Sequence, residues 1–114
     1  MVRDPGLEEL LRTDIGDLPG LSEKPMFGGL CFMVNGNMMQ FVRDDGAMYR
    51  VGKSQEHIAL NLPGTEAMYQ RGVRKHGLVW LSGDQFDDDD TRLRLTELAR
   101  AAVQYLPPKE RSPC

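Results

Sequence analysis

Met-Phe-Gly-Gly-Leu-Cys-Phe-Met-Val-Asn-Gly-Asn-Met-Met-Gln-Phe-Val, residues 26–42, is the stretch that decides the fold. Residues 26–34 form a near-continuous apolar run, which predicts a strand buried on both faces. Asn35 and Gly36 tolerate positive φ, which a type I′ hairpin turn requires at both central positions. The chain then returns along residues 38–43, so this stretch predicts an antiparallel β-hairpin.

The following residues extend the hairpin into a larger sheet. Residues 44–46, Asp-Asp-Gly, predict a second turn into a strand over residues 47–51, so that three strands form an antiparallel meander. Two further strands are expected at residues 67–70 and 78–81. The polar residues 71–77 between these two strands are expected to form a hairpin loop.

Three helices surround these strands in the sequence. Asp4 is a good N-cap for a helix that begins at Pro5, with leucines at helical spacing up to residue 15. Ser54 is the expected N-cap of a second helix, which Pro63 ends. The last helix is expected over residues 90–106, with acidic side chains crowding its N-terminus and leucines and alanines on one face.

Length and composition describe one ordinary globular domain. The chain has 114 residues, of which 40% are hydrophobic and 27% charged, and residues 107–114 are expected to be a frayed tail. No apolar run approaches the roughly 20 residues of a membrane span, and the N-terminus lacks the pattern of a signal peptide. Two widely spaced cysteines fit a reducing cytoplasm. The net charge of −3 argues against general nucleic-acid coating.

No group of residues has the pattern of a catalytic, metal or cofactor site. Gly28-Gly29 precedes a strand rather than a helix, so we expect a bulge or a close backbone approach and not a phosphate loop. Cys31 lies mid-strand among apolar residues, where burial raises the pKa of a thiol and blunts its reactivity. The four aspartates at 87–90 lack the alternate spacing of calcium ligands. We therefore expect no metal, no cofactor and no activated cysteine.

One local group of basic residues is the candidate partner-binding site. Arg71, Arg74 and Lys75, followed by His76, fall on the predicted 71–77 loop. One interpretation is a solvated turn, because isolated basic loops are common. The other is a contact to a phosphate backbone or to an acidic partner, since arginine offers bidentate hydrogen bonds and lysine a point charge.

The seven methionines raise the question of a second surface. We expect most of them in the core, although the flexible thioether also suits adaptable binding surfaces. Met38 and Met39 are neighbours in one strand, and neighbouring side chains point to opposite faces of a sheet. One of the two therefore faces away from the core, and that outer face needs a cover, either a helix or another subunit.

Three motifs together resemble the N-terminal domain of the TfoX/Sxy family. They are Met26-Phe27-Gly28-Gly29-Leu30, Val34-Asn35-Gly36-Asn37-Met38 and Tyr105-Leu106-Pro107-Pro108-Lys109. The resemblance runs from about residue 24 to 109 and implies an α+β fold, a five-stranded antiparallel sheet with flanking helices in the order α-β-β-β-α-β-β-α. It also implies a non-enzymatic protein. Two-domain members regulate natural competence with the cyclic-AMP receptor protein and carry a helical C-terminal domain, whereas this chain ends at Cys114. Residues 1–114 are thus expected to form one stand-alone domain.

These observations favour a regulatory or adaptor module that acts through protein–protein contacts in the cytoplasm. A protein partner is expected, a homodimer stays open, and neither membrane binding nor direct nucleic-acid binding is expected. The alternative is a small-ligand-binding protein or small enzyme that uses a pocket between the sheet and the helices. Nucleic-acid binding through residues 71–76 is the weakest of the three hypotheses.

Overall fold

The computed structural model describes residues 4–106, so the predicted frayed tail at 107–114 lies outside the described residues. Along these residues, the first helix is followed by four strands, the second helix by two strands, and the third helix comes last; two short 3-10 turns (η1 and η2) precede the second and third helices. The bounds are α1 Pro5–Ile15, β1 Leu21–Met26, β2 Gly29–Val34, β3 Asn37–Arg43, β4 Gly46–Arg50, η1 Lys53–Gln55, α2 Glu56–Leu60, β5 Thr65–Gln70, β6 Val73–Ser82, η2 Gly83–Gln85 and α3 Asp89–Gln104.

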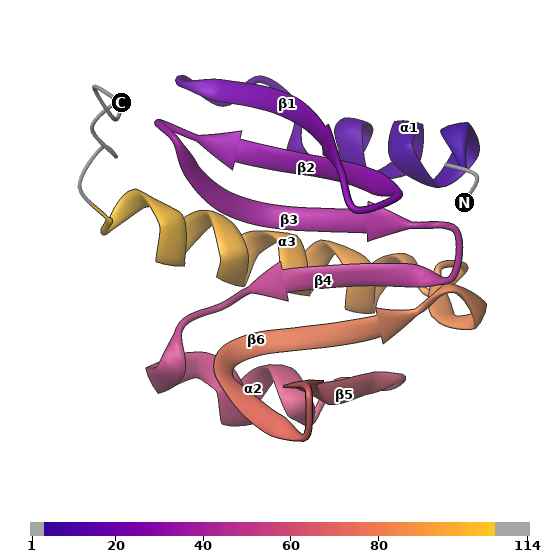
Figure 1. Cartoon of the computed structure of the whole chain (residues 1–114), viewed down its shortest axis with the longest axis vertical. Coiled ribbons are helices and arrows are strands. Elements are labelled where there is room, and N and C mark those ends of the chain that lie inside the picture. Colours follow the sequence, from indigo (N-terminus) through magenta and orange to yellow (C-terminus); the bar gives the residue numbers. More distant parts are fainter. Residues whose placement is uncertain (1–3, 107–114) are drawn as a thin grey trace.

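The described strands form a single antiparallel sheet in the order β1-β2-β3-β4-β6-β5. The helices lie on one face of this sheet, and Figure 1 looks onto the other face, with α3 running behind the strands. The α+β class and the meander over β2, β3 and β4 are confirmed. None of the described helices combines the length and the apolar character needed to cross a membrane.

The predicted number of strands was wrong, because the sheet has six strands rather than five. The expected strand over residues 26–34 is divided by a turn at Phe27-Gly28, where φ is 49° and 75°. The chain before this turn forms β1, which pairs with β2 along its length. Its sequence is polar and contains Pro25, which is compatible with an edge strand because one side of an edge needs no ladder hydrogen bonds. Because β1 is mostly polar, the pattern of apolar residues does not predict it.

The predicted loop over residues 71–77 was also too long. Arg71 and Gly72 alone make the turn, with φ of 53° and 78°, and β6 begins at Val73. Gly77 has a φ of 87° within β6, and only the residues after it pair with β4. Before Gly77, β6 pairs with β5 and not with β4, so the turn end of the β5–β6 hairpin extends beyond β4.

Local hydrogen bonds explain where two of the helices begin. The Asp4 carboxylate accepts hydrogen bonds from the Gly6 and Leu7 amides at 3.0 and 3.1 Å, as expected for an N-cap. Asp88 caps α3 in the same way, accepting from the Thr91 amide at 3.1 Å. The expected cap at Ser54 was wrong, because this residue lies inside η1 and caps no helix.

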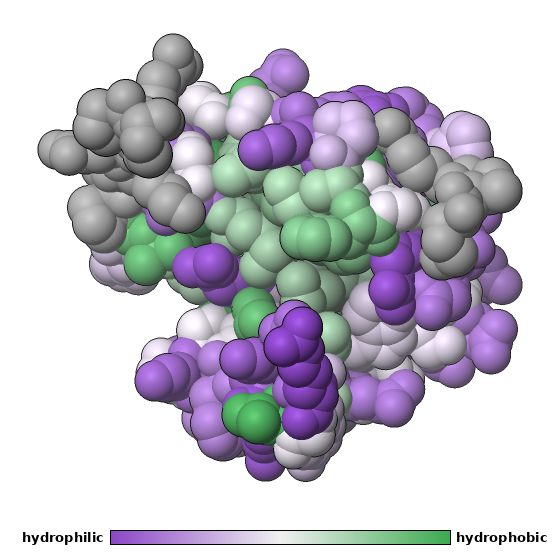
Figure 2. All heavy atoms as spheres, in the orientation of Figure 1, coloured by the Kyte–Doolittle hydropathy of each residue, from purple (hydrophilic) through white to green (hydrophobic). Residues whose placement is uncertain are grey.

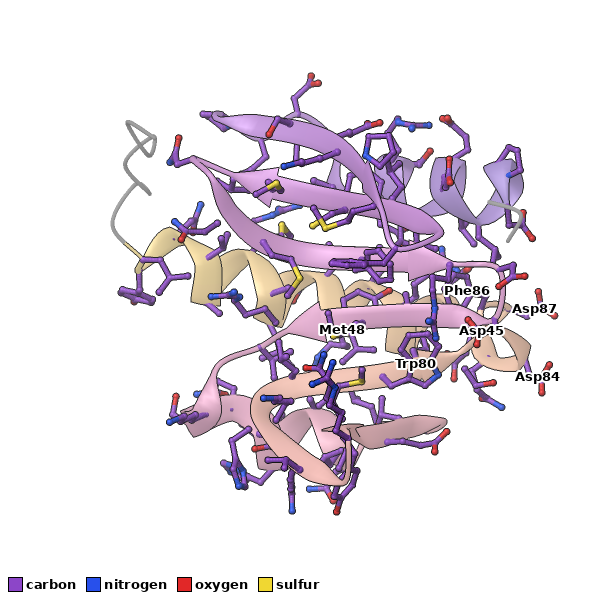
Figure 3. The ribbon with its side chains drawn as sticks, viewed as in Figure 1. Asp45, Met48, Trp80, Asp84, Phe86 and Asp87 are labelled. Atoms are coloured by element: carbon purple, nitrogen blue, oxygen red, sulfur yellow. The ribbon has the colours of Figure 1, made fainter. Side chains whose placement is uncertain are left out.

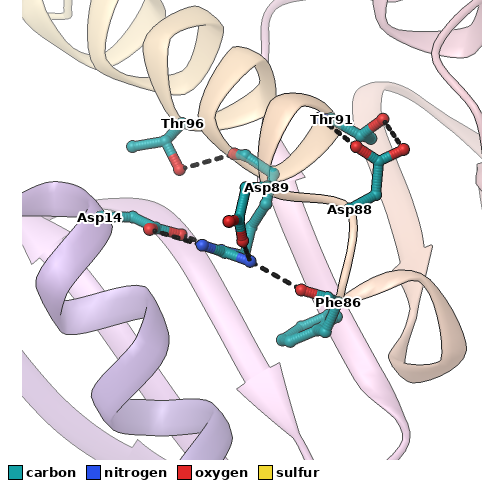
Figure 4. Close-up of polar contacts among 7 residues, drawn as sticks. Asp14, Phe86, Asp88, Asp89, Thr91 and Thr96 are labelled. Carbon is teal, nitrogen blue, oxygen red and sulfur yellow. Dashed lines mark hydrogen bonds and ion pairs between the residues drawn. The ribbon is translucent and has the colours of Figure 1, made fainter.

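The core fills the layer between the sheet and the helices. Its largest fully buried apolar side chains come from α1, from the strands and from α3, and they are Leu11, Leu30, Phe32, Met39, Tyr49, Leu81 and Leu95. A buried ion pair joins the two long helices across this layer (Figure 4). The Arg92 Nε donates to the Asp14 carboxylate at 2.5 Å, and its Nη1 donates to the Phe86 carbonyl at 2.6 Å. This contact fixes α1 against the start of α3.

Candidate binding surface

The face of the sheet opposite the helices, called the open face below, is apolar rather than polar. One row of side chains crosses all six strands on this face, as the strand register shows. From β1 to β5 the row reads Lys24, Cys31, Phe41, Met48, Trp80 and Glu66. Figure 3 shows Met48 and Trp80 on the neighbouring strands β4 and β6. Cys31 and Phe41 are buried there, outside the main core cluster.

Methionines provide much of this face, so the expectation that most of them lie in the core was wrong. Met39 is fully buried in the core, whereas its neighbour Met38 lies on the open face, which confirms that the two point to opposite sides. A β-bulge in β3 at this point places the two methionines opposite the single residue Met33 of β2. The methionines that line the open face are half-buried: Met26, Met38, Met48 and Met68.

The open face is hollowed into a groove of about 450 Å³. One wall is the β1–β2 turn with Phe27, and the other is the β5–β6 hairpin with Tyr69 and Lys75; Phe41 and Leu78 lie between them. Figure 2 shows an apolar area over the centre of this face and polar side chains around it. The bend at Gly77 forms the second wall, because from there the turn end of the β5–β6 hairpin extends beyond β4.

Phe27 is the least expected residue of this groove. Its side chain is 85% exposed, and its backbone has a φ of 49°, a region that bulky residues rarely adopt. The same kind of turn one hairpin later uses Asn35, the residue type that tolerates this conformation. Neither stability nor solubility accounts for a phenylalanine in this position. Strained residues of this kind cluster at functional sites.

Positive charge lies close to the apolar row. Burial raises the pKa of the Cys31 thiol above its usual value. The nearby charges of Arg50 and Lys24 lower this pKa, but by less than burial raises it. The thiol is therefore protonated at neutral pH and a poor nucleophile. The guanidinium of Arg43 lies 5.2 Å from the centre of the Trp80 ring, a cation–π contact, and pairs with Asp45 at the β3–β4 turn.

The structure divides the three predicted partner-binding residues. Arg71 is exposed in the turn of the β5–β6 hairpin. Lys75 lines the groove, whereas Arg74 points the other way, as alternation along β6 requires. Arg74 Nη2 lies 3.0 Å from the Glu56 carboxylate, which is 7% exposed, so this arginine holds α2 against the hairpin. Lys75 is the member of the set that faces the open side of the sheet.

Glu56 joins α2 to β6 and makes the fold sensitive to acid. Burial alone would raise the pKa of Glu56, but hydrogen bonds from Arg74, His76 and the Gly77 amide outweigh it and lower the pKa. The carboxylate then stays ionised in the folded chain at pH values where the unfolded chain binds a proton. Its contribution to stability is therefore present above the unfolded pKa, about 4.3, and is lost as the pH falls through the folded value.

We expect Glu56→Gln to lower the free energy of unfolding at neutral pH and to remove part of its acid dependence. The difference between the wild type and the variant should stay constant above about pH 5 and shrink as the pH falls below about 4.3, because the unfolded chain and then the folded carboxylate bind a proton there. Urea unfolding followed by circular dichroism at a series of pH values measures this difference. A difference that stays constant down to the lowest pH would contradict the assigned role of Glu56.

The other candidates from the sequence do not converge on a chemical site. Gly29 packs against backbone, since a Cβ there would lie 2.3 Å from the Val42 carbonyl oxygen, as expected for a close approach. Asp88 of the aspartate run caps α3. Within residues 4–106, no three histidine, cysteine, aspartate or glutamate side chains gather closely enough to hold a metal ion. The centre of the space between the sheet and the helices holds the core cluster, and a pocket of about 410 Å³ lies at its margin, between the end of α3 and Arg50.

Sequence reasoning missed the groove itself. Phe27 was assigned to a strand, so its exposed position in a turn was not foreseen. Two signals pointed toward this surface: the Met38-Met39 pair, which required an outer face, and Gly28, whose type suits the second position of a tight turn. The wall formed by Tyr69 and Lys75 depends on a bend that sequence patterns do not show.

A comparison with known protein families matches most of this fold. A family model described as the TfoX N-terminal domain matches residues 14–104, which include every strand of the sheet and most of the residues of the helices. No curated protein and no solved structure matches the chain. The match covers well over half of the 114 residues and agrees with the motifs around Asn35-Gly36. The chain therefore belongs to the TfoX N-terminal domain family.

Proposed function

We propose that this protein is a non-enzymatic regulatory or adaptor module that binds a partner protein through the open face of its sheet. The observation that carries the proposal is the groove, whose apolar side chains are half-buried and face outward. No helix among residues 4–106 packs on this side. Contiguous exposed apolar surface of this kind marks interaction sites in monomeric proteins.

The composition of the groove supports a protein partner. Exposed aromatic side chains stand on both walls, Phe27 at 85% and Tyr69 at 59% exposure, and aromatic residues are enriched among the anchors of protein interfaces. The methionine floor can adapt its shape to a bound side chain because the thioether chain is flexible. The two widely spaced cysteines support a cytoplasmic location for this contact.

The alternative of a ligand pocket between the sheet and the helices has less support. Such a site needs a concave space lined by a few convergent polar groups. The centre of that layer is filled by apolar side chains from α1, α3 and the strands. At its margin, Arg50 and His76 line a pocket of about 410 Å³ beside the end of α3, but their side chains are the only titratable ones there apart from Lys53 among the described residues. The regulatory proposal therefore rests on the opposite side of the sheet.

Two substitutions on the walls of the groove test this proposal. Phe27→Asn gives the turn the residue type that Asn35 provides in the next hairpin, so the fold is expected to keep or slightly increase its stability. Combined with Tyr69→Ser, it removes both exposed aromatics. We expect the double variant to lose roughly tenfold or more in partner affinity with an unchanged melting temperature. Leu93→Ser, on the exposed side of α3, is the control.

The measurement is affinity capture from lysate of the native cells, with quantitative mass spectrometry of wild type and both variants. A partner retained by the wild type and by Leu93→Ser, but lost from the double variant, supports the open face. A partner lost from Leu93→Ser and retained by the double variant would place the interface on the helical side and overturn the proposal.

A further inference from the structure

The charges around the groove indicate the kind of partner that it accepts. We propose that the open face binds an acidic amphipathic helix, whose apolar side chains enter the groove and whose carboxylates meet Lys24, Arg50 and Lys75. This inference rests on the proposed function and adds the chemistry of the partner.

The first support is an excess of unpaired positive charge on this face of an acidic protein. The chain carries a net charge of −3, yet none of these three cations forms an ion pair with any residue between 4 and 106. Two carboxylates lie on or beside the same face. Asp45 is paired with Arg43, and Glu66 lies on the edge strand β5 at the far end of the row from Lys24. The end of the face near Arg50 is thus positive.

The second support is the setting of Arg50. Its Nε is buried and has no hydrogen-bond partner among the described residues. Arg50 lines a pocket next to the groove, and Leu78, its partner in register, lines both. The charge of Arg50 also acts on Cys31 of the open face. A buried guanidinium nitrogen without a partner is costly, and a carboxylate is the group that satisfies it best. An acidic side chain that reaches from the groove past Leu78 into this pocket would supply that group.

The third support is that an apolar sheet face is a surface on which a helix can pack. Domains are built from layers, and the other face of this sheet already accepts helices against apolar side chains. A helix with apolar residues at i, i+3, i+4 and i+7 presents one such stripe. Addition of a partner strand would use an edge of the sheet instead, and the β1 edge carries Lys24 and Pro25, which discourage strand pairing.

The same charges argue against two other occupants. In a symmetric dimer the same surface meets itself, so a second copy on this face would bring a second set of the same unpaired cations into the interface. A single-stranded nucleic acid requires aromatic planes for stacking along a broadly positive channel. The groove floor is made of methionine and leucine side chains, with few cations, and Glu66 would repel phosphates at one edge.

Fluorescence anisotropy with synthetic probes tests the inference on the purified full chain. The first probe is a helical peptide of about four turns with leucines at i, i+3, i+4 and i+7 and glutamates elsewhere. The second has lysine in place of each glutamate, the third has serine in place of each leucine, and the fourth is a single-stranded oligonucleotide. We expect the first peptide to bind at least roughly tenfold more tightly than the others, and more weakly as salt increases.

Variants assign the binding to the named cations. The triple change Lys24→Gln, Arg50→Gln and Lys75→Gln should weaken binding of the first peptide roughly tenfold and flatten its salt dependence. Arg94 is an exposed cation of α3 that forms no ion pair within residues 4–106, so Arg94→Gln should leave both unchanged. Phe27→Asn, which keeps these charges, should weaken binding without changing the salt dependence. Melting curves for each variant confirm that the fold is retained.

The inference is overturned if the lysine peptide or the oligonucleotide binds as well as the acidic peptide. It is also overturned if sedimentation shows a dimer that Phe27→Asn dissociates, or if the triple variant binds the acidic peptide like the wild type. These outcomes differ from failure of the proposed function. A partner captured through Phe27 and Tyr69 but indifferent to the three cations would leave the open face as the interface and remove only the acidic helix.

Discussion

Arg92→Ala is expected to lower the free energy of unfolding by about 3–5 kcal/mol, because it leaves the Asp14 carboxylate buried without its partner. The side chains of Arg92 and Asp14 are 5% and 4% exposed. The guanidinium also donates to the Phe86 carbonyl at 2.6 Å and to Asp89 at 2.8 Å. One substitution thus removes the hydrogen bonds from the start of α3 to α1 and to Phe86, while Arg100 still donates to the Ile15 carbonyl at 2.9 Å. Urea unfolding at neutral pH measures the loss.

Arg94→Ala is the matched control for this experiment. It lies on the same helix, is exposed, and should change stability by no more than about 0.5 kcal/mol. In the double variant of Arg92 and Asp14, both charges are absent, so its loss should be smaller than the sum of the two single losses. A loss below about 1 kcal/mol for Arg92→Ala would show that the ion pair does not hold α1 in place.

Phe32→Ala is expected to destabilise the protein by about 3–5 kcal/mol, since it opens a cavity in the core. Phe32 is 0% exposed and lies on the helix side of β2. Phe27→Ala provides a control of the same residue type five positions away. With 85% of its side chain exposed, it should change stability by only about 0.5 kcal/mol. Similar losses for the two substitutions would contradict the assignment of the two sides of the sheet.

The sequence predicts most of this fold where residue types match the local conformation. Asn35-Gly36 and Arg71-Gly72 have the same left-handed backbone as Phe27-Gly28, with φ between 49° and 84° in all three turns. The first contains a residue pair that favours this turn, and it was located correctly. The Phe27 turn was missed because phenylalanine favours strands, and tertiary packing decided against that preference. Because this turn was not predicted, the strand β1 before it was not predicted either.

The candidate site was less predictable, because it depends on which residues meet across strands. The Met38-Met39 pair alone showed that an apolar side chain must face away from the core. The basic group at Arg71, Arg74 and Lys75 looked like one patch, since residues in a loop have no defined faces. Once they belong to a turn and a strand, Arg74 and Lys75 lie on opposite sides. Had the sequence analysis begun β6 at Val73, the alternation of side chains along a strand would have placed Arg74 and Lys75 on opposite faces.

The ion pair between α1 and α3 also has a consequence for the order in which a new chain can fold. Asp14 and Arg92 are separated by 78 residues, whereas most strand pairs of the sheet join sequence neighbours. A ribosome adds about 5–20 residues per second, so several seconds pass between the synthesis of the two partners. During that interval the hairpins of β1 to β4 can already form, but α1 has no buried guanidinium to dock against. The ion pair that locks the first helix in place can therefore form only after the last helix has been synthesised.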